Sequence, residues 1–308
     1  MEKRKVFINT DNPRKLKNYI SAFLDLENEL KLNSTTLRHH TSVLERFGNI
    51  SSVDSIRENG VKAVEDFFSS CNTSFVMSEY SQKSYYSVLK KFFKFLREND
   101  VIENKVIEEV EEHRFLLPDV KPFFFSESDD KKIIAAMKKK PKNRGGEVFE
   151  RNVMVLKLMR FAGMRPVDVR EVRINDIYSN GRGVFHVPFG EELDNASSDE
   201  STRREVTIVE EIISDELHVL LERGYNFLCE SPKSKRILTT DELGLMSKKI
   251  QKNAGIDEPL GLMAYRHTYI KELCEEGLKV DTIRRKAHLS SRRAILNYFT
   301  VLGIKQSF

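Results

Sequence analysis

The sequence predicts a mainly α-helical protein with a small β-hairpin, divided into two domains. Its 308 residues are about the length at which single hydrophobic cores stop growing and chains divide. Apolar residues recur at helical spacing through most of the chain. Two short segments, 184–189 and 204–209, are instead rich in β-branched and aromatic residues, which is typical of strands. We therefore expect a helical first domain and a second domain of mixed α/β structure.

The composition excludes several classes of protein. Hydrophobic residues make up 40% of the chain and charged residues 32%, so the chain can bury a core under a hydrated surface. No apolar run approaches the roughly 20 residues that a membrane span needs, and the first ten residues lack the apolar core of a secretion signal. The three cysteines, Cys71, Cys229 and Cys274, have no metal-ligand spacing. We expect a cytoplasmic protein with no metal, no cofactor and no membrane partner.

The net charge of +4 is only mildly basic. Residues 1–120 hold 18 Lys and Arg against 19 Asp and Glu, and the remaining residues hold 33 against 28. The chain is therefore not a polycation. Any surface that binds a polyanion must be a local patch on one face of a domain.

In the first domain we expect four helices, because apolar stripes at helical spacing cover 12–30, 33–48, 61–69 and 78–97. Beside its aromatic stripe, the last of these helices carries Lys83, Lys90, Lys91 and Lys94. Arg38 lies on the polar face of the second helix. Two interpretations stay open for these side chains, a solvated surface or contacts to the phosphates of DNA.

The character of the sequence changes after the fourth helix. An acidic run followed by Pro118 and Pro122 predicts a linker over 105–124. The first domain then covers 1–104 and the second covers 125–308. Helices of the second domain are expected over 126–139, 150–162, 214–224, 241–254, 268–276 and 280–286.

Four side chains of the second domain suit phosphate chemistry. Arg266 can bind two phosphate oxygens at once, His288 can donate a hydrogen bond or move a proton, and Tyr298 can act as a nucleophile. Far upstream, Arg165 lies in a turn immediately before Pro166, a residue suited to the first turn of a helix. Each has an ordinary alternative role, a helix cap for Arg165 and core packing for His288 or Tyr298. Only their convergence in space makes a phosphodiester site.

Three short segments stand out, AGMRPVD at 162–168, RHT at 266–268, and AHLSS at 287–291 followed by a tyrosine. With these as its most specific segments, the sequence resembles the tyrosine recombinases, the phage-integrase family. The resemblance covers nearly the whole chain. It implies a helical core-binding domain, which contacts DNA, in front of a mixed α/β tyrosine-recombinase catalytic domain.

The resemblance also implies roles for individual residues. Arg165 and Arg266 fall on the two arginines that bind the scissile phosphate, and His288 falls on the histidine near the end of the catalytic domain. Tyr298 falls on the nucleophile and is the only tyrosine after His288. Asp168 matches an acidic position that supports the active site in the family.

The sequence departs from the family pattern in its proton-handling groups. The family has histidine or lysine three residues before the second arginine, and this chain has Met263 there. The family also carries a lysine on the hairpin, whereas this chain has none between Lys157 and Lys233. Arg204 fits the usual arginine of the hairpin. Arg203 is the nearest cation to the lysine's place, so we take it as a candidate substitute.

As a whole, the resemblance implies a site-specific recombinase or integrase that cuts and rejoins double-stranded DNA through a 3′-phosphotyrosyl intermediate. The phosphotyrosine stores the bond energy, so no ATP and no metal ion is expected. A homotetramer on DNA is implied, with accessory proteins as further candidate partners, and His267 joins the expected DNA contacts. The apolar tail 299–308 either docks on a neighbouring subunit or packs within its own chain.

Two other functions stay open. One is a catalytically impaired relative that binds DNA without cutting it, which Met263 and the missing lysine favour. The other is a nicking-closing enzyme like the type IB topoisomerases, which shares the chemistry but needs no partner site.

Overall fold

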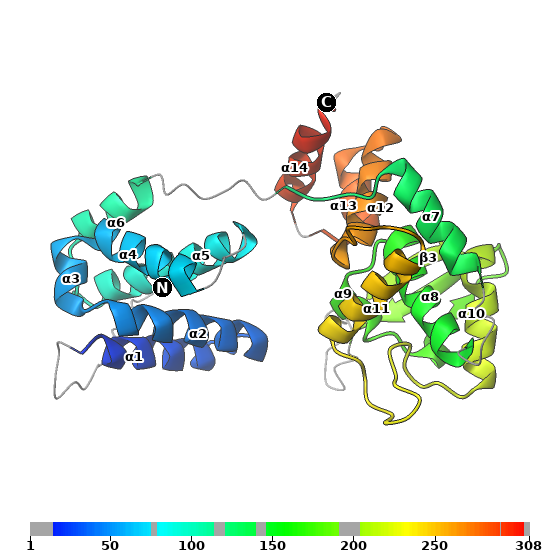
Figure 1. Ribbon diagram of the computed structural model, residues 1–308, viewed down its shortest axis with the longest axis horizontal. Coiled ribbons are helices and arrows are strands. Elements are labelled where there is room, and N and C mark those ends of the chain that lie inside the picture. The colour runs from blue at the N-terminus through cyan, green and yellow to red at the C-terminus, as the bar shows by residue number, and fades with distance from the viewer. Residues whose placement is uncertain are drawn as a thin grey trace. The chain divides into compact units, whose positions relative to one another are not determined.

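A computed structural model gives the fold, and the structure describes residues 15–74, 79–113, 121–139, 146–190, 204–289 and 291–304. The chain separates into two units, unit 1 over Met1–Val120 and unit 2 over Lys121–Phe308 (Figure 1). Each unit has its own hydrophobic core.

Unit 1 is helical throughout its described residues. Its elements are α1 (Leu16–Glu29), α2 (Ser34–Ile50), α3 (Val53–Glu58), α4 (Gly60–Ser74), α5 (Glu79–Glu98) and α6 (Asn104–Glu112). The second, third and fourth of the predicted helices correspond to α2, α4 and α5, while α3 was not predicted because its six residues are too short for a periodic pattern.

The helix α5 shows how the sequence builds this core. Val88, Leu89, Phe92, Phe93 and Leu96 recur at the spacing of one helical face, and none is more than 2% exposed. The lysines of the same helix fall outside this stripe. The apolar pattern thus sets which side of α5 faces the core and which side carries charge.

The structure corrects the predicted linker. Residues 104–112 form α6, which packs against α4 and α5, and its Val106, Ile107 and Val110 are buried in the core of unit 1. The hydroxyl of Tyr86 on α5 also donates to the carbonyl of Val110 at 2.7 Å. The acidic residues that suggested a linker are the solvent side of an amphipathic helix. The rest of the predicted linker includes residues 114–120, which lie outside the described part of the chain.

Unit 2 combines helices with one small sheet. Its elements are α7 (Glu127–Lys138), α8 (Gly146–Phe161), α9 (Pro166–Val169), a 3₁₀ turn η1 (Ile174–Asp176), β1 (Tyr178–Ser179), β2 (Val184–Phe189), β3 (Arg204–Val209), α10 (Glu210–Glu222), α11 (Thr240–Asn253), α12 (Met263–Glu275), α13 (Val280–Lys286) and α14 (Arg292–Leu302).

The sheet is antiparallel, with strand order β1-β2-β3. Both long strands have the bounds that the sequence predicts, and their register pairs Val184 with Val209 and Phe189 with Arg204. Val206 and Ile208 face the core of unit 2 while their neighbours along β3 do not, because side chains alternate between the faces of a strand.

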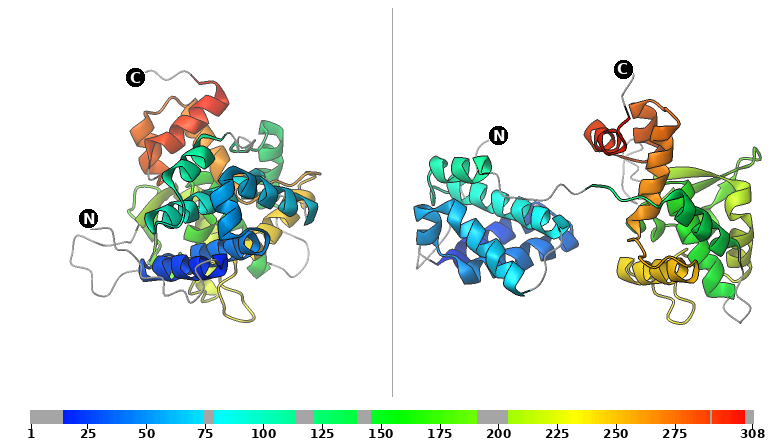
Figure 2. Two further views of the ribbon diagram at one scale, coloured as in Figure 1. Left: turned by 90° about the vertical axis from the view of Figure 1, so that its left-hand side faces the viewer. Right: turned by 45° about the horizontal axis from the view of Figure 1, so that its top comes forward.

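The helix α12 is longer than predicted. It begins at Met263 rather than at residue 268, so Arg266 and His267 lie in its first turns and share a face with Met263. Figure 2 shows α12 leading from the body of unit 2 toward α13 and α14. Its strongest packing is against α8, and it also contacts α13 and α14.

A buried arginine fixes α12 to its neighbours. Arg160 on α8 is 2% exposed and makes a double hydrogen bond to Asp130 on α7, at 2.8 and 2.7 Å. The same guanidinium donates to both carboxylate oxygens of Glu272 on α12. Three helices are thereby joined through one side chain.

Candidate active site

The first arginine of the site lies in the turn between α8 and α9. Gly163 has φ of +65°, a left-handed conformation that glycine adopts at little cost, and it ends α8. Arg165 follows it and precedes Pro166, the first residue of α9. Its guanidinium donates to Asp168 through Nε at 2.8 Å and Nη2 at 2.6 Å. The bidentate pair fixes the plane of the guanidinium.

Asp168 holds two arginines. Its carboxylate also accepts a hydrogen bond from Nη2 of Arg204 on β3 at 3.1 Å, and the guanidinium of Arg204 lies 4.7 Å over the ring of Phe189. Burial alone raises the pKa of Asp168, but its hydrogen bonds and charge interaction with Arg165 outweigh this, so the pKa lies below its usual range. Asp168 is therefore ionised at neutral pH and positions both guanidinium groups.

Arg266 is the most buried cation of the site. It lies on α12, is 3% exposed, and donates to the backbone carbonyls of Gly163 and Ala287, the latter at 2.5 Å. Burial, and to a lesser extent the charge of Arg165, lowers its pKa from the usual value. Within the described ranges no carboxylate lies at salt-bridge distance from its guanidinium.

His288 occupies an unusual backbone position. It follows α13 with φ of +46°, a left-handed conformation that few non-glycine residues adopt. Its ring stands edge-on to Phe189 of β2 at 5.7 Å. Burial lowers its pKa, and the charges of Arg204 and Arg266 lower it further. A backbone strained in this way is often found at functional sites.

Tyr298 lies on α14 and is 7% exposed. Its hydroxyl is 2.5 Å from Nδ1 of His267 on α12, and its ring lies 6.1 Å from that of Phe124. Burial raises the pKa of Tyr298 to about 12, although the charge of Arg266 acts in the opposite direction. Burial and the charge of Arg266 lower the pKa of His267 to about 4.

The structure brings the sequence-predicted residues together. The charge of Arg266 acts on the pKa of His288 and of Tyr298, and Arg266 itself responds to Arg165 and Asp168. Residues that are about 130 positions apart in the sequence thus interact electrostatically through Arg266, and among the cations of the site only Arg266 acts on the hydroxyl of Tyr298. Their catalytic roles remain a prediction.

Two further predictions have a different outcome. Arg203, the candidate substitute for the missing lysine, lies outside the described residues. Met263 is half-buried in the first turn of α12 and, as the sequence showed, contributes no group that moves a proton.

A three-residue segment covers the nucleophile candidate. Phe123, Phe124 and Phe125 come just before α7, and their rings pack on His267, Tyr298 and Tyr265 respectively. The backbone N–H of Phe125 donates to the hydroxyl of Thr268 at 3.0 Å, which ties this segment to α12. We call residues 123–125 the phenylalanine strap.

Among comparisons with known proteins, only the comparison with solved structures gives matches. The sequence matches no protein-family model and no curated protein. Among solved structures, the XerH site-specific recombinase bound to its difH substrate has a TM-score of 0.66 at 14% identity, over 97% of this chain and 99% of that chain. A lambda integrase dimer bound to a COC′ core site has 0.63 at 14%, over 91% and 96%. The Tn1549 transposon integrase in complex with a circular intermediate DNA has 0.68 at 13%, over 92% and 94%.

The chain has the fold of the tyrosine recombinases. The match extends over both units, because each of these alignments includes more than nine tenths of the chain. At this low identity the likeness concerns the fold, and the chemistry of the site rests on the side chains described above.

The residues expected to contact DNA from unit 1 lie on two neighbouring helices of the recombinase fold. Lys91 and Lys94 on α5 are exposed, and the ammonium of Lys90 lies 5.3 Å over the ring of Tyr86. The helix α2 packs beside α5, and its exposed Arg38 is next to a residue that contacts α5, because His39 hydrogen-bonds to Ser84 at 2.8 Å. Lys83 is the chain neighbour of Ser84 on α5.

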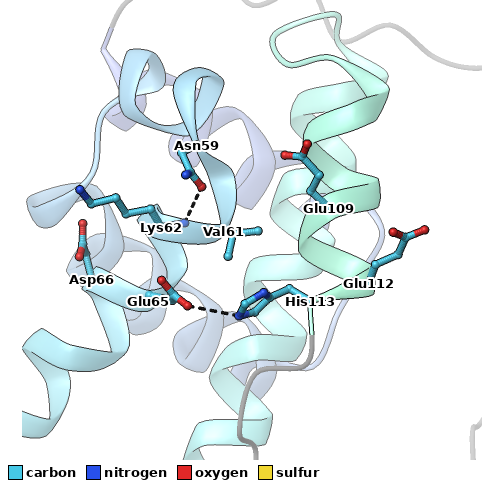
Figure 3. Close-up of a pocket in the computed structure, with 8 residues that line it drawn as sticks. All are labelled: Asn59, Val61, Lys62, Glu65, Asp66, Glu109, Glu112 and His113. Atoms are coloured by element: carbon cyan, nitrogen blue, oxygen red, sulfur yellow. Dashed lines mark hydrogen bonds and ion pairs between the residues drawn. The ribbon is translucent and has the colours of Figure 1, made fainter.

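A hollow between α4 and α6 of unit 1 has the opposite charge. Figure 3 shows the carboxylates of Glu65, Asp66, Glu109 and Glu112 around it, with Lys62 and His113 as the only basic side chains drawn. Its volume is about 620 Å³, and His113 pairs with Glu65 at 3.2 Å. Four carboxylates repel phosphate, so this face of unit 1 does not suit DNA.

The described part of the chain lacks the features of two other kinds of site. No group of three or more His, Cys, Asp and Glu side chains there is arranged to hold a metal ion. No described helix has the length and apolar character that crossing a membrane requires.

Sequence reasoning missed two features of this site. His267 was expected to contact DNA, and the structure places its ring against the hydroxyl of Tyr298 instead of leaving it at the surface. The phenylalanine strap was not predicted as part of the site. The sequence carried one signal for the first feature, since His267 lies four residues after Met263 and therefore on the same face of a helix.

Proposed function

We propose that the chain is a DNA strand-exchange enzyme, a site-specific recombinase or integrase. Tyr298 attacks a scissile phosphate, forms a 3′-phosphotyrosyl link and releases a 5′ hydroxyl. The observation that carries the proposal is Arg266, a buried guanidinium without a carboxylate partner in the described chain, whose charge acts on Tyr298. A buried charge with no carboxylate in contact is costly, and Asp168 acts on this one only from beyond salt-bridge distance. A bound phosphate supplies negative charge in direct contact.

The other cations surround the same phosphate. The side chain of Arg165 is 40% exposed although Asp168 holds it, so a substrate can reach its outer edge. Arg165, Arg266 and His288 together offer donors to the oxygens of a pentacoordinate phosphorus. Fixed donors of this kind stabilise the transition state most, because they are already oriented when charge develops.

DNA is the proposed partner, and solved structures with the same fold are bound to DNA. In unit 1 the proposed phosphate contacts are Arg38, Lys83, Lys90, Lys91 and Lys94, since sequence-independent binding requires only positive charge near the backbone of the duplex. In a recombinase, a homotetramer brings two duplex sites together for two rounds of strand exchange.

Trapping the covalent intermediate tests the proposal. Duplexes that the wild-type protein binds are selected from a random pool and nicked at successive positions, so that the short strand with the 5′ hydroxyl diffuses away after cleavage. Wild type is expected to accumulate a protein–DNA adduct that withstands denaturation, with or without a chelator. Tyr298→Phe is expected to form none, because the ring remains and only the nucleophilic oxygen is lost.

The matched control is Tyr269→Phe. Tyr269 is the other tyrosine of α12 and α14 that influences the pKa of Arg266, so it is the strongest competing nucleophile. Its variant should form adduct at close to the wild-type level. An adduct that persists in Tyr298→Phe and disappears in Tyr269→Phe would show that the nucleophile is misassigned.

One observation favours a second candidate, a recombinase-fold protein that binds DNA without cutting it. The hydroxyl of Tyr298 is buried with a pKa raised to about 12, and Met263 brings no proton acceptor. This candidate predicts a stable complex of wild-type protein with the selected duplexes and no covalent adduct at any nick position.

A further inference from the structure

The hydroxyl of Tyr298 has one polar neighbour at hydrogen-bond distance in the described structure, the imidazole of His267. The Nδ1···Oη distance is 2.5 Å, and the two ring centres are 5.7 Å apart. The partners come from α12 and α14, which pack together. The strap contributes only apolar rings to this pair, Phe123 on His267 and Phe124 on Tyr298. The hydrogen bond is thus enclosed by protein on the side of the strap.

Both members of the pair are uncharged at neutral pH. The pKa of Tyr298 is raised to about 12, and that of His267 is lowered to about 4. The groups that act on them are Arg266, which faces both, and Cys274, which acts on Tyr298 only. A neutral imidazole with its hydrogen on Nε2 accepts at Nδ1, so a phenol hydroxyl donates to it.

His267 lies where it can replace the proton-handling side chain that Met263 does not provide. Met263 lies where the family resemblance leads one to expect a proton-handling side chain, and His267 is one helical turn further on the same face. A phenol whose pKa is far above neutral is a poor nucleophile until a base takes its proton. His267, the only histidine of α12, therefore contacts the hydroxyl of Tyr298, which is the group that has to lose a proton.

Substrate binding increases the basicity of His267. Burial is the first cause of its low pKa, and the positive charge of Arg266 is the second. A phosphate bound to Arg266 brings negative charge next to this guanidinium, which reduces its effect on the imidazole and favours the protonated form. The proton acceptor thus becomes stronger when the scissile phosphate is in place.

We propose that His267 is the proton acceptor for Tyr298, a role that rests on the strand-exchange function proposed above. As the Oη–P bond forms, the proton of the hydroxyl moves to Nδ1 of His267. The P–O5′ bond breaks with its electron pair on O5′, which takes a proton from water. In the reverse step the 5′ hydroxyl loses its proton to water and attacks phosphorus, the P–Oη bond breaks, and His267 returns its proton to Tyr298.

The experiment compares adduct formation by wild type, His267→Asn and His218→Asn in single turnover on the selected nicked duplexes. Asparagine places a polar atom near the position of Nδ1 but accepts no proton. We expect His267→Asn to react about 10²- to 10⁴-fold more slowly at pH 7, the usual effect of losing a general base. His218 on α10 is exposed, and its variant should match wild type.

The pH profile separates proton transfer from positioning. The wild-type rate should rise as pH increases through the pKa of His267 in the complex and then level off, because only the neutral imidazole accepts a proton. His267→Asn should lack this plateau and rise steadily with pH, so that its deficit shrinks in alkali. A deficit of the same size at every pH would reduce His267 to a positioning residue and overturn the proposal.

A sulfur leaving group distinguishes proton transfer from the nucleophile, Tyr298, from proton transfer to the leaving 5′ oxygen. In a duplex whose bridging 5′ oxygen is replaced by sulfur, the leaving thiolate needs no proton. The deficit of His267→Asn should persist on this duplex, whereas full recovery would assign His267 to the leaving group.

A faster rate in His267→Asn than in wild type would show that the hydrogen bond restrains Tyr298. Adduct formation by wild type with no deficit in His267→Asn overturns this inference alone, while no adduct from wild type overturns the proposed function and this inference together.

Discussion

The geometry of the candidate active site depends on Gly163, because glycine has no side chain. A Cβ atom on this residue would lie 2.5 Å from two ring carbons of Tyr269, and its φ of +65° is unfavourable for any other residue. The same residue supplies the carbonyl to which Arg266 donates. Its backbone position therefore determines where the turn with Arg165 and the guanidinium of Arg266 meet.

We expect Gly163→Ala to lower the free energy of unfolding by about 2–5 kcal/mol. A left-handed alanine costs about 1–2 kcal/mol and overpacking about 1–3 kcal/mol. The control is Gly277→Ala, because Gly277 has φ of +72° but open space around its Cα, so only the first cost applies. Urea unfolding of both variants measures the difference. Equal losses would mean that Tyr269 moves aside freely.

The sequence singled out the candidate site residues but not their contacts. Arg165, Arg266 and Tyr298 stand in short local patterns, and in the structure Arg165 and Tyr298 both act electrostatically on Arg266. The bond between His267 and Tyr298 joins residues 31 positions apart and depends on how α14 packs on α12. No local pattern encodes that packing.

At the scale of elements, α12 carries the site and Arg160 holds α12 in place. Arg160 joins α7, α8 and α12 through Asp130 and Glu272, and it is almost fully buried. A buried ion pair adds little net stability when it is intact, but the loss of one partner leaves the other charge uncompensated.

Arg160→Met should lower the free energy of unfolding by about 3 kcal/mol, near the low end for broken buried pairs because Glu272 remains half exposed. It should also slow adduct formation, since α12 positions Arg266. The surface pair of Arg236 with Glu242 provides the comparison, and Arg236→Met should leave the unfolding curve close to that of wild type. Chemical denaturation followed by circular dichroism tests both. An Arg160→Met curve that overlays wild type would contradict this account of α12.

The sequence predicted elements well where a pattern was long and periodic. Both strands and the core stripe of α5 follow directly from alternation and helical spacing. It failed at α6, where acidic residues concealed Val106, Ile107 and Val110. The prediction from sequence also placed the start of α12 too late, at residue 268 instead of Met263. The first turns of that helix carry polar residues on the face that belongs to the site.

At the scale of the whole molecule, the chain is two units with separate cores. The boundary lies after α6, so the part of the chain that completes the core of unit 1 extends beyond the predicted limit of residue 104. Gly60 on α4 shows how close this packing is, because a Cβ there would lie 2.7 Å from a methyl carbon of Val106.

A fragment covering residues 1–113 should therefore unfold cooperatively, whereas one covering 1–104 should not. The shorter fragment lacks the buried side chains of Val106, Ile107 and Val110. The burial of each such side chain contributes about 1.5–3 kcal/mol to stability. This loss is comparable to the total stability of a domain of this size. Thermal unfolding of the two fragments by circular dichroism decides the matter. Matching cooperative transitions would place α6 outside the folding unit.

The sequence by itself determined the fold class, both long strands, the core faces of the helices and the candidate nucleophile. These follow from periodicity and short motifs, which are properties of residues close together in the chain. Only the tertiary structure decided that Arg266 is buried without a carboxylate in the described chain, that Asp168 holds two arginines, and that His267 contacts Tyr298. These features depend on which helices pack together, and the free energy of that packing is shared among many distant residues.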